Sequence, residues 1–464
     1  MDLYNVFKSR KCVIGVFALN SLLLLSSCGG CSCTTNSKDT ENRPDSVNLN
    51  FADADNALQK GNLALYVDYS TCMAPANSSD FLKKIESSFI GADPTYYSIK
   101  GKNITKEDGN PYNLFRTIQE VQFADIKTAA QNIVDGNTEG ALLTDGEYYE
   151  SVKVNGSKGH VNDPYLKDVF KKWLSKGHDI YIISEPYDES GTDTNKNKVY
   201  HKKRFYFLFT DSRLQGNIYQ RIVASVDLKK YPNVGVYHMS TSHPVVMTPD
   251  QTTTPSPNLA AKVEGRGGYE IQDWQVDWKS IMDLFGAGAV DEKTGQPLPN
   301  GAPLITGLNI DREVYGCFRI KNIKLKVYDI DNAYFDYYTS KSAHTRAGVL
   351  TGKLSDYELQ NAFTFDSKLF KKTGRVAILL DPSFDPSMLT GDPFNYIKID
   401  VCVDGVENVF ENNEKFFYFD SVDNSAKTNT SLSESVKQCL VDPSIQHSMD
   451  GTVIYSIYIK SNKN

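Results

Sequence analysis

Two short apolar runs in this chain each end in an acidic residue. The run Leu63–Val67 is followed by Asp68-Tyr69-Ser70, and the run Ala141–Leu143 is followed by Thr144-Asp145-Gly146. Such runs are typical of strands that are buried on both faces of a sheet. Open α/β sheets bind ligands at the carboxyl ends of their strands. We therefore expect Asp68, Ser70 and Asp145 to meet at one sheet edge, where they suit a hard cation.

The pattern from residue 61 to 246 alternates between strands and helices. Apolar residues at helical spacing predict helices, the first three being 79–89, 112–118 and 125–134, and apolar runs predict further strands. This order is typical of an α/β fold with a doubly wound, mainly parallel sheet. The remaining predicted helices are 164–176 and 217–224, and the predicted strands are 96–99, 180–183, 205–209 and 234–246.

The pattern changes after a linker over residues 247–270, which contains Thr252-Thr253-Thr254-Pro255-Ser256-Pro257. Residues 271–464 contain alternating segments such as 397–403 and 453–460, which predict half-buried strands. The alternation changes phase at 322–323, which indicates a bulge. We expect an antiparallel β-sandwich of the immunoglobulin-like kind here. It holds one helix, 431–440, with Ser431 and Glu434 as a capping box.

The first residues are typical of an export signal. Lys8, Arg10 and Lys11 precede an apolar stretch over residues 12–25, which is too short to span a bilayer. Leu25-Ser26-Ser27-Cys28 follows and resembles the lipobox of bacterial lipoproteins. The resemblance implies a signal peptide over 1–27 and fatty acylation of Cys28, which anchors the chain outside the cytoplasm, in the outer membrane. An ordinary secretory signal is the alternative.

Composition narrows the function further. Residues 28–60 are mostly small and polar, which predicts a disordered tether. The net charge of −7 argues against nucleic acid as a partner. The seven histidines show no zinc-hydrolase spacing, and neither a G-x-S-x-G elbow nor a phosphate-binding glycine loop occurs. A disulfide between Cys402 and Cys439, or between Cys317 and one of them, fits an oxidising compartment.

The acidic strand ends also carry a family resemblance. Asp68-Tyr69-Ser70-Thr71-Cys72 and the later Asp145 are similar to the adhesion motif of von Willebrand factor type A domains, D-x-S-x-S with a middle Thr and a late Asp. Cys72 stands where the family has its second Ser, and Ala124 where it has the Thr. The resemblance implies a Mg²⁺ or Ca²⁺ site formed by Asp68, Ser70 and Asp145, with Asp125 as a compensating ligand.

These features together favour binding over catalysis. We expect a lipid-anchored cell-envelope protein that binds a protein partner at the carboxyl edge of its α/β domain, through the divalent cation. The alternative for Asp68 and Asp145 is a structural role, in which each caps the N-terminus of the helix that follows it. At the level of the whole protein, the alternatives are a hydrolase of surface polymers and a purely structural envelope subunit.

Overall fold

The fold is taken from a computed structural model of the 464-residue chain. The structure describes residues 58, 62–108, 121, 123–152, 156–160, 162–190, 198–212, 214–241, 269–275, 281–286, 302–310, 312–314, 316–329, 353–354, 360–381, 394–421 and 427–462. Cys28, the signal peptide, almost all of the predicted tether, the predicted helix 112–118 and the linker up to residue 268 lie outside these ranges. The predictions made for them remain predictions.

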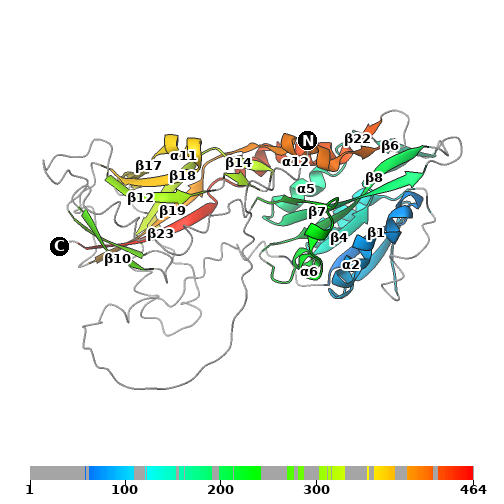
Figure 1. Cartoon of the computed structure of the whole chain (residues 1–464), viewed down its shortest axis with the longest axis horizontal. Coiled ribbons are helices and arrows are strands. Elements are labelled where there is room, and N and C mark those ends of the chain that lie inside the picture. The colour runs from blue at the N-terminus through cyan, green and yellow to red at the C-terminus, as the bar shows by residue number, and fades with distance from the viewer. Residues whose placement is uncertain are drawn as a thin grey trace, which may run out of the picture. The chain divides into compact units, whose positions relative to one another are not determined.

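A seven-stranded sheet organises the first half of the chain, in the order β3-β2-β1-β4-β8-β7-β9 (Figure 1). β1 pairs in parallel with β2 on one side and with β4 on the other. The fold is thus α/β, as predicted. The strands are β1 (Ala64–Asp68), β2 (Thr95–Lys100), β3 (Asn103–Lys106), β4 (Gly140–Thr144), β7 (Asp179–Ser190), β8 (Val199–Thr210) and β9 (Gly235–Met239).

The prediction of a mainly parallel sheet is wrong. β8 runs antiparallel to both β4 and β7, β9 runs antiparallel to β7, and β3 runs antiparallel to β2. β7 and β8 are twelve residues long each and are paired from Asp179↔Thr210 to Ser190↔Val199. Only eight residues separate Ser190 from Val199, which is too few for a parallel crossover. The two strands therefore form a long hairpin.

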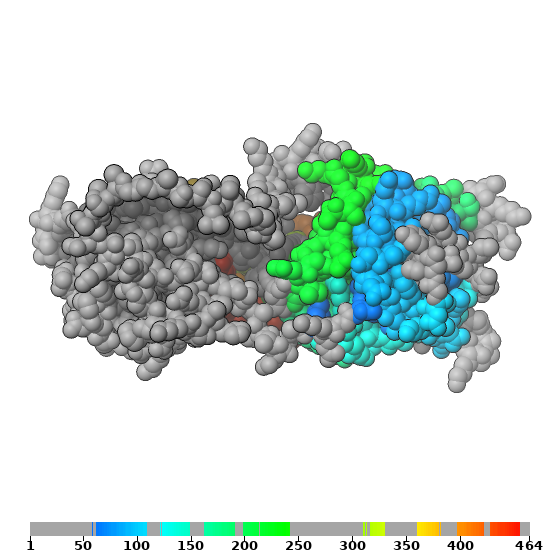
Figure 2. Space-filling model, turned by 90° about the horizontal axis from the view of Figure 1, so that it is seen from below, coloured from blue at the N-terminus to red at the C-terminus, as the bar shows by residue number. Residues whose placement is uncertain are grey.

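Helices cover both faces of the sheet. Side chains alternate across each strand, so Leu65 and Val67 of β1 pack with α2 and α6, while Tyr66 packs with α4, α5 and α12. α2 and α6 lie side by side, and the blue and green segments that contain them adjoin in Figure 2. The helices are α2 (Asp80–Ile90), α4 (Ile126–Gly136), α5 (Lys167–Leu174), α6 (Ile218–Ser225) and α12 (Ser431–Leu440).

The helix boundaries follow local sequence signals. Ser79 accepts a hydrogen bond from the Leu82 backbone N–H at 2.9 Å and begins α2.

The predicted capping box of α12 is wrong. Its N-cap is Thr430, which makes no side-chain cap bond, and the Asn429 side chain accepts from the Ser431 backbone N–H at 3.0 Å instead.

The second half of the described chain is β-rich, as expected. Its largest sheet has the order β10-β11-β23-β19-β15-β16, and two three-stranded sheets have the orders β12-β18-β17 and β13-β14-β20. Apart from the parallel pair β11–β23, their pairings are antiparallel. The immunoglobulin-like topology itself stays a prediction. The predicted bulge at 322–323 is instead a break between β14 and β15, which belong to different sheets.

The remaining elements have the following bounds. The strands are β5 (Tyr148–Val152), β6 (Gly156–His160), β10 (Tyr269–Gln275), β11 (Ile281–Gly286), β12 (Ala302–Asn309), β13 (Glu313–Val314), β14 (Phe318–Ile320), β15 (Ile323–Asp329), β16 (Lys353–Leu354), β17 (Phe363–Phe365), β18 (Arg375–Leu380), β19 (Phe394–Val403), β20 (Val406–Asn408), β21 (Phe419–Asp420), β22 (Thr428–Asn429) and β23 (Val453–Asn462). The helices are α11 (Ser367–Thr373) and α13 (Pro443–His447), with 3₁₀ turns η2 (Thr71–Met73), η3 (Pro75–Ser78), η5 (Leu228–Lys230), η8 (Phe410–Asn412) and η9 (Glu414–Phe417).

The cysteines in the described ranges form no disulfide. Cys72, Cys317, Cys402 and Cys439 are all free thiols. Cys317 instead lies 3.0 Å from the Tyr237 hydroxyl, and the Cys402 thiol faces the Asp400 carbonyl at 3.8 Å. The predicted pairings among Cys317, Cys402 and Cys439 are therefore not formed, and these residues act as small buried side chains.

Candidate cation site at the carboxyl edge

The two acidic strand ends meet at one edge of the sheet. Asp68 is the last residue of β1, and Asp145 directly follows β4. β1 and β4 are parallel neighbours in which Val67 pairs with Leu143, so both strands end at the same edge. Both carboxylates are 1% exposed. The structure thus brings together Asp68, Ser70 and Asp145 as the sequence predicted.

Hydroxyl groups hold the Asp68 carboxylate in place. Its Oδ1 accepts hydrogen bonds from the Ser70 backbone N–H at 2.8 Å and from the Ser70 hydroxyl at 2.6 Å. Its Oδ2 accepts from the Thr144 hydroxyl at 2.8 Å. Since each carboxylate oxygen has two lone pairs, Oδ2 retains one acceptor position. Asp68 is therefore both a brace between β1 and β4 and a group that remains able to bind a cation.

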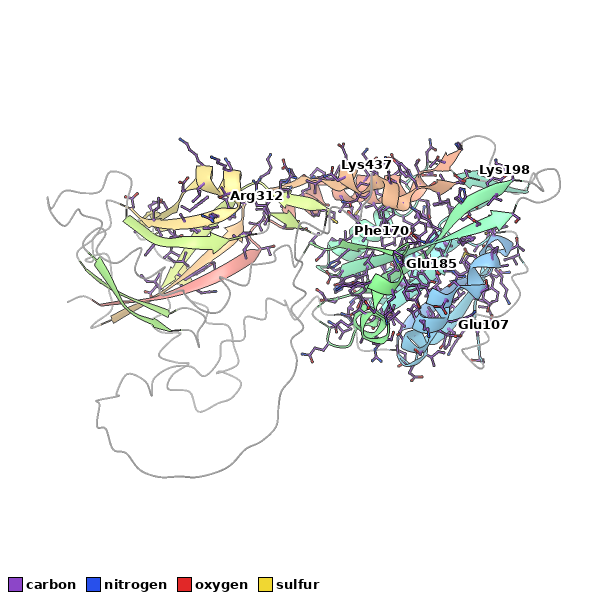
Figure 3. The ribbon with its side chains drawn as sticks, viewed as in Figure 1. Glu107, Phe170, Glu185, Lys198, Arg312 and Lys437 are labelled. Atoms are coloured by element: carbon purple, nitrogen blue, oxygen red, sulfur yellow. The ribbon has the colours of Figure 1, made fainter. Side chains whose placement is uncertain are left out.

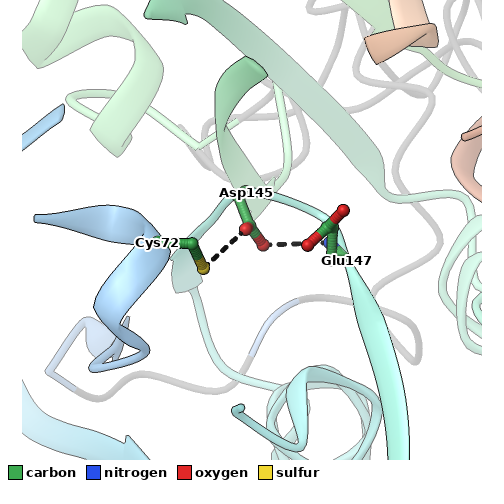
Figure 4. A group of neighbouring side chains, drawn as sticks. All are labelled: Cys72, Asp145 and Glu147. Carbon is green, nitrogen blue, oxygen red and sulfur yellow. Dashed lines mark hydrogen bonds between the residues drawn. The ribbon is translucent and has the colours of Figure 1, made fainter. Parts of the chain in front are cut away.

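Cys72 connects the two acidic residues. Its Sγ lies 3.1 Å from the Ser70 hydroxyl and donates to Asp145 Oδ2 at 2.9 Å (Figure 4). Asp145 Oδ1 accepts from the Glu147 backbone N–H at 2.9 Å. Ligand atoms of Cys72, Asp145 and Glu147 all lie within 4.8 Å of one another. We call these three residues the edge triad.

The turn inside the edge triad requires glycine. Gly146 has φ +76°, a conformation that other residues rarely adopt. A Cβ atom at this position would lie 2.4 Å from Leu432 Cδ1 of α12. The Gly146 carbonyl also accepts from the Tyr165 hydroxyl at 2.8 Å. Packing from α12 and a hydrogen bond from Tyr165 thus fix the turn that places Asp145 beside Glu147.

The β7–β8 hairpin brings two cationic side chains, Lys202 and Arg204, to this edge. Lys202 on β8 has a fully buried side chain, and its ammonium donates to Glu147 Oε1 and lies 3.9 Å from Glu189 Oε2. Arg204 lies opposite Glu185 across the hairpin, and its Nη2 donates to Asn77 at 2.5 Å (Figure 3 labels Glu185). The hairpin therefore supplies the charged groups beyond the ends of β1 and β4.

Negative charge exceeds positive charge in this group of buried residues. Asp68, Asp145 and Glu147 are at most 7% exposed, as is the Lys202 ammonium that contacts Glu147. Three carboxylates and one ammonium leave two surplus negative charges when all four groups are ionised. Burial of unbalanced charge is costly, so such groups either take up protons or bind a cation.

The pKa values of the site agree with this surplus. Burial, followed by the charge of Asp68, raises the pKa of Asp145 to about 6. Burial likewise raises the pKa of Asp68. The pKa of the Cys72 thiol is raised by burial and then by the neighbouring Asp145 charge. One divalent cation would balance the two surplus charges and reverse these shifts.

Tyr187 completes the surroundings of the edge triad. Its hydroxyl oxygen is buried and has no hydrogen-bond partner among the residues that the structure describes. Burial raises the pKa of this hydroxyl, followed by the charges of Asp145 and Cys72. Tyr187 pairs with Lys202 across the hairpin, so both side chains project from the same face. The hydroxyl is thus a neutral oxygen close to the cluster.

Asp125 has a different place. It is the N-cap of α4 and accepts from the Thr128 backbone N–H at 3.1 Å and from the Thr128 hydroxyl at 2.8 Å. Its neighbour Ala124 forms an isolated bridge with Gly101. Among the described residues, the group suited to a metal is the edge triad, without Asp125. Its proposed role as a ligand stays a prediction.

Three further residues of the site were not selected from the sequence. Glu147 follows Asp145 by two residues, and this short spacing was the available signal. Lys202 belongs to the run Lys202-Lys203-Arg204, which precedes the apolar part of β8 and indicates that the strand extends beyond the covered sheet. Tyr187 had no comparable signal, because its position depends on the hairpin register.

Comparison with known proteins assigns no family. The chain matches no protein-family model, no curated protein and no solved structure. Within the described ranges, none of the helices has the length and apolar character needed to cross a membrane.

Proposed function

We propose that this chain is a binding protein that recognises a protein partner at the carboxyl edge of the seven-stranded sheet, through a divalent cation. The observation that carries the proposal is the group of three buried carboxylates around one ammonium, Asp68, Asp145 and Glu147 with Lys202. A cation of charge +2 would balance the group. Asp68, Ser70 and Asp145 are the residues for which the sequence predicted Mg²⁺ or Ca²⁺.

The proposed partner contributes a carboxylate. Divalent cations in proteins often retain coordination positions that are filled by water or by a ligand. An acidic side chain of a partner that replaces such a water would connect the two proteins through the ion. The resemblance to von Willebrand factor type A domains supports this mode of recognition at Asp68, Ser70 and Asp145. We include a divergent domain of that type in the proposal.

The proposed location is the cell envelope. Acylation of Cys28 would hold the chain at the outer membrane, because two or more buried acyl chains anchor a protein stably. The α/β region would then present its carboxyl edge to proteins of the same compartment. A Cys28→Ala variant is expected to lose partitioning into the membrane fraction, whereas a Cys31→Ala variant is expected to keep it.

Thermal unfolding of the full-length protein tests the cation. Unfolding midpoints are measured in EDTA and then with excess Mg²⁺, Ca²⁺ or Zn²⁺. A cation at 100 times its Kd stabilises the folded state by about 2.7 kcal/mol. We expect a higher midpoint with at least one of these ions for the wild type, a loss of the effect in Asp145→Asn, and no loss in Asp135→Asn on α4. No shift with any ion would refute the proposal.

Immobilised full-length protein tests the partner. An envelope extract is passed over the wild type and over Asp145→Asn, and bound proteins are eluted with EDTA. We expect a protein that elutes from the wild type alone and that binds again, once purified, only when the divalent cation is present. Equal recovery from both columns would show that binding does not use this edge.

A further inference from the structure

The three side chains of the edge triad differ in chemistry from a magnesium site. Their ligand atoms are one sulfur and two carboxylate oxygens, all within 4.8 Å of one another (Figure 4). Zn²⁺ binds sulfur at about 2.3 Å and oxygen at about 2.0–2.2 Å in tetrahedral geometry, so its ligand atoms are about 3.4–3.7 Å apart. Small side-chain movements are thus sufficient for Cys72, Asp145 and Glu147 to bind one ion together.

We propose that the cation at this edge is Zn²⁺ or an ion of similar softness, and that the Cys72 thiolate is one of its ligands. This inference rests on the proposed function, because it specifies the ion that the carboxyl edge binds. Mg²⁺ and Ca²⁺ prefer oxygen ligands, whereas thiolate favours zinc and related transition metals. Cys72, Asp145 and Glu147 provide three protein ligands, and a fourth position remains for water or for the partner's carboxylate.

A second observation points to a ligand at the same place. The Tyr187 hydroxyl oxygen is buried and lacks a hydrogen-bond partner within the described part of the chain. It interacts electrostatically with Asp145, Cys72 and Glu147. A water or hydroxide on the ion would accept or donate the missing hydrogen bond. The Tyr187 hydroxyl is thus a candidate partner for a water bound to an ion at the edge triad.

The existing hydrogen bonds define what changes when the ion binds. The Cys72 thiol donates a hydrogen bond to Asp145 Oδ2. On binding, the S–H bond breaks, the proton leaves to solvent, and both Sγ and Oδ2 become available to the metal. Glu147 binds Lys202 through Oε1, and we assign its carboxylate to the ion as the third ligand. The affinity should therefore increase with pH, since one thiol proton is released.

Lys202 is the main competitor for this position. Its ammonium contacts Glu147 and neutralises part of the charge that would attract an ion. The ion must either displace this ammonium or bind beside it. The surplus of two negative charges around Lys202 favours binding beside it. Glu189, at 3.9 Å from Lys202 Nζ, offers the ammonium an alternative partner when Glu147 binds metal.

The test measures Zn²⁺, Mg²⁺, Ca²⁺ and Co²⁺ binding to the full-length chain. Cys12, Cys28, Cys31 and Cys33 are replaced by Ser, so that thiols outside the described residues bind no metal. Isothermal titration should give one Zn²⁺ per chain, bound at least about tenfold more tightly than Mg²⁺. Co²⁺ should produce a sulfur-to-cobalt charge-transfer absorption. A Cys72→Ser variant should lose this absorption and at least about tenfold in Zn²⁺ affinity.

A Cys402→Ala variant is the matched control, because Cys402 is also a buried free thiol but lies on β19. It should keep both the absorption and the Zn²⁺ affinity. Absence of a sulfur-to-cobalt band in the protein with Cys72 intact would refute thiolate ligation, whether or not the Cys72→Ser variant folds. If Mg²⁺ or Ca²⁺ binds as tightly as Zn²⁺, the inference fails while the proposed function stands. If no divalent ion binds, both fail.

Discussion

Two opposite edges of the seven-stranded sheet each bury a pair of aspartates, and they differ in how the charge is balanced. At the amino end of β4, Asp179 Oδ1 lies 2.8 Å from His238 Nε2, and Asp211 Oδ2 lies 3.1 Å from His178 Nδ1. Each of these carboxylates has an imidazole beside it. At the carboxyl end, Asp68 and Asp145 share their surroundings with Glu147 and a single ammonium.

The comparison shows that buried acidic residues alone do not indicate a cation site. Asp179 also accepts from the Ser212 backbone N–H at 2.6 Å, and Trp173 donates to the Asp179 carbonyl at 2.9 Å. These contacts fasten the beginning of β7 to the loop after β8. The amino edge is therefore a structural junction, whereas the carboxyl edge gathers three buried carboxylates around the Lys202 ammonium.

The largest effect is expected from removal of the buried ammonium. Lys202→Met leaves Glu147 buried without its ion-pair partner, which costs about 3–5 kcal/mol of unfolding free energy. Urea denaturation in EDTA measures the loss, and added Zn²⁺ should recover part of it. Lys172→Met is the control, because Lys172 forms an exposed pair with Asp135 and its loss should change stability little. If both substitutions lowered the unfolding free energy equally, the role of Lys202 as the buried ion-pair partner of Glu147 would be contradicted.

At the amino edge, Asp179→Asn should destabilise the fold without changing metal binding. The substitution removes the charge from contacts with the Ser212 N–H and the His238 imidazole, which are worth about 1.5–3 kcal/mol for a buried charged acceptor. Denaturation and Zn²⁺ titration are measured on the same sample. A change in Zn²⁺ affinity would show that the two edges are coupled.

The pH dependence of stability should distinguish Asp145 directly. Its pKa is raised by burial to about 6 from 3.8, so the folded state binds the proton more tightly than the unfolded state. In the absence of divalent cations, the unfolding free energy of the wild type should increase relative to that of Asp145→Asn as the pH falls from 7 to 4. The increase should be on the order of 2 kcal/mol. This contribution is lost as the pH rises through 6. Parallel stability profiles of the two proteins would contradict it.

The smallest effect concerns Asp125. Asp125→Ala removes the N-cap of α4 and should cost about 1 kcal/mol. Because its carboxylate accepts from the Thr128 backbone and side chain, we expect unchanged metal affinity. Denaturation measures the first effect and titration the second. A marked loss of metal affinity in this variant would show that Asp125 contributes to the cation site.

The sequence was informative where one local pattern determines a position. The apolar runs before Asp68 and Asp145 predicted their meeting, because β1 and β4 are parallel neighbours. The starts of the helices predicted at 79 and 217 are likewise local, because Ser79 and Asn217 are the N-caps of α2 and α6. Such features depend on a few neighbouring residues and on burial of one face.

Features that depend on strand direction were not predictable in this way. The apolar runs 180–183 and 205–209 are buried on both faces. The sequence of such a run is the same whether its neighbouring strands are parallel or antiparallel to it. The antiparallel hairpin is what carries Tyr187 and Lys202 beyond the ends of β1 and β4. The positions of Tyr187 and Lys202 in the site therefore depend on a pairing register that composition and periodicity do not specify.

The contact between Gly146 and Leu432 has a consequence for truncated forms of the chain. The site begins at residue 68, yet the side chain packed against its central turn belongs to α12, far later in the sequence. A fragment cut before α12 would possess every ionisable group of the edge but lack the packing behind Gly146. Such a fragment should therefore hold the turn between Asp145 and Glu147 less firmly than the whole chain does.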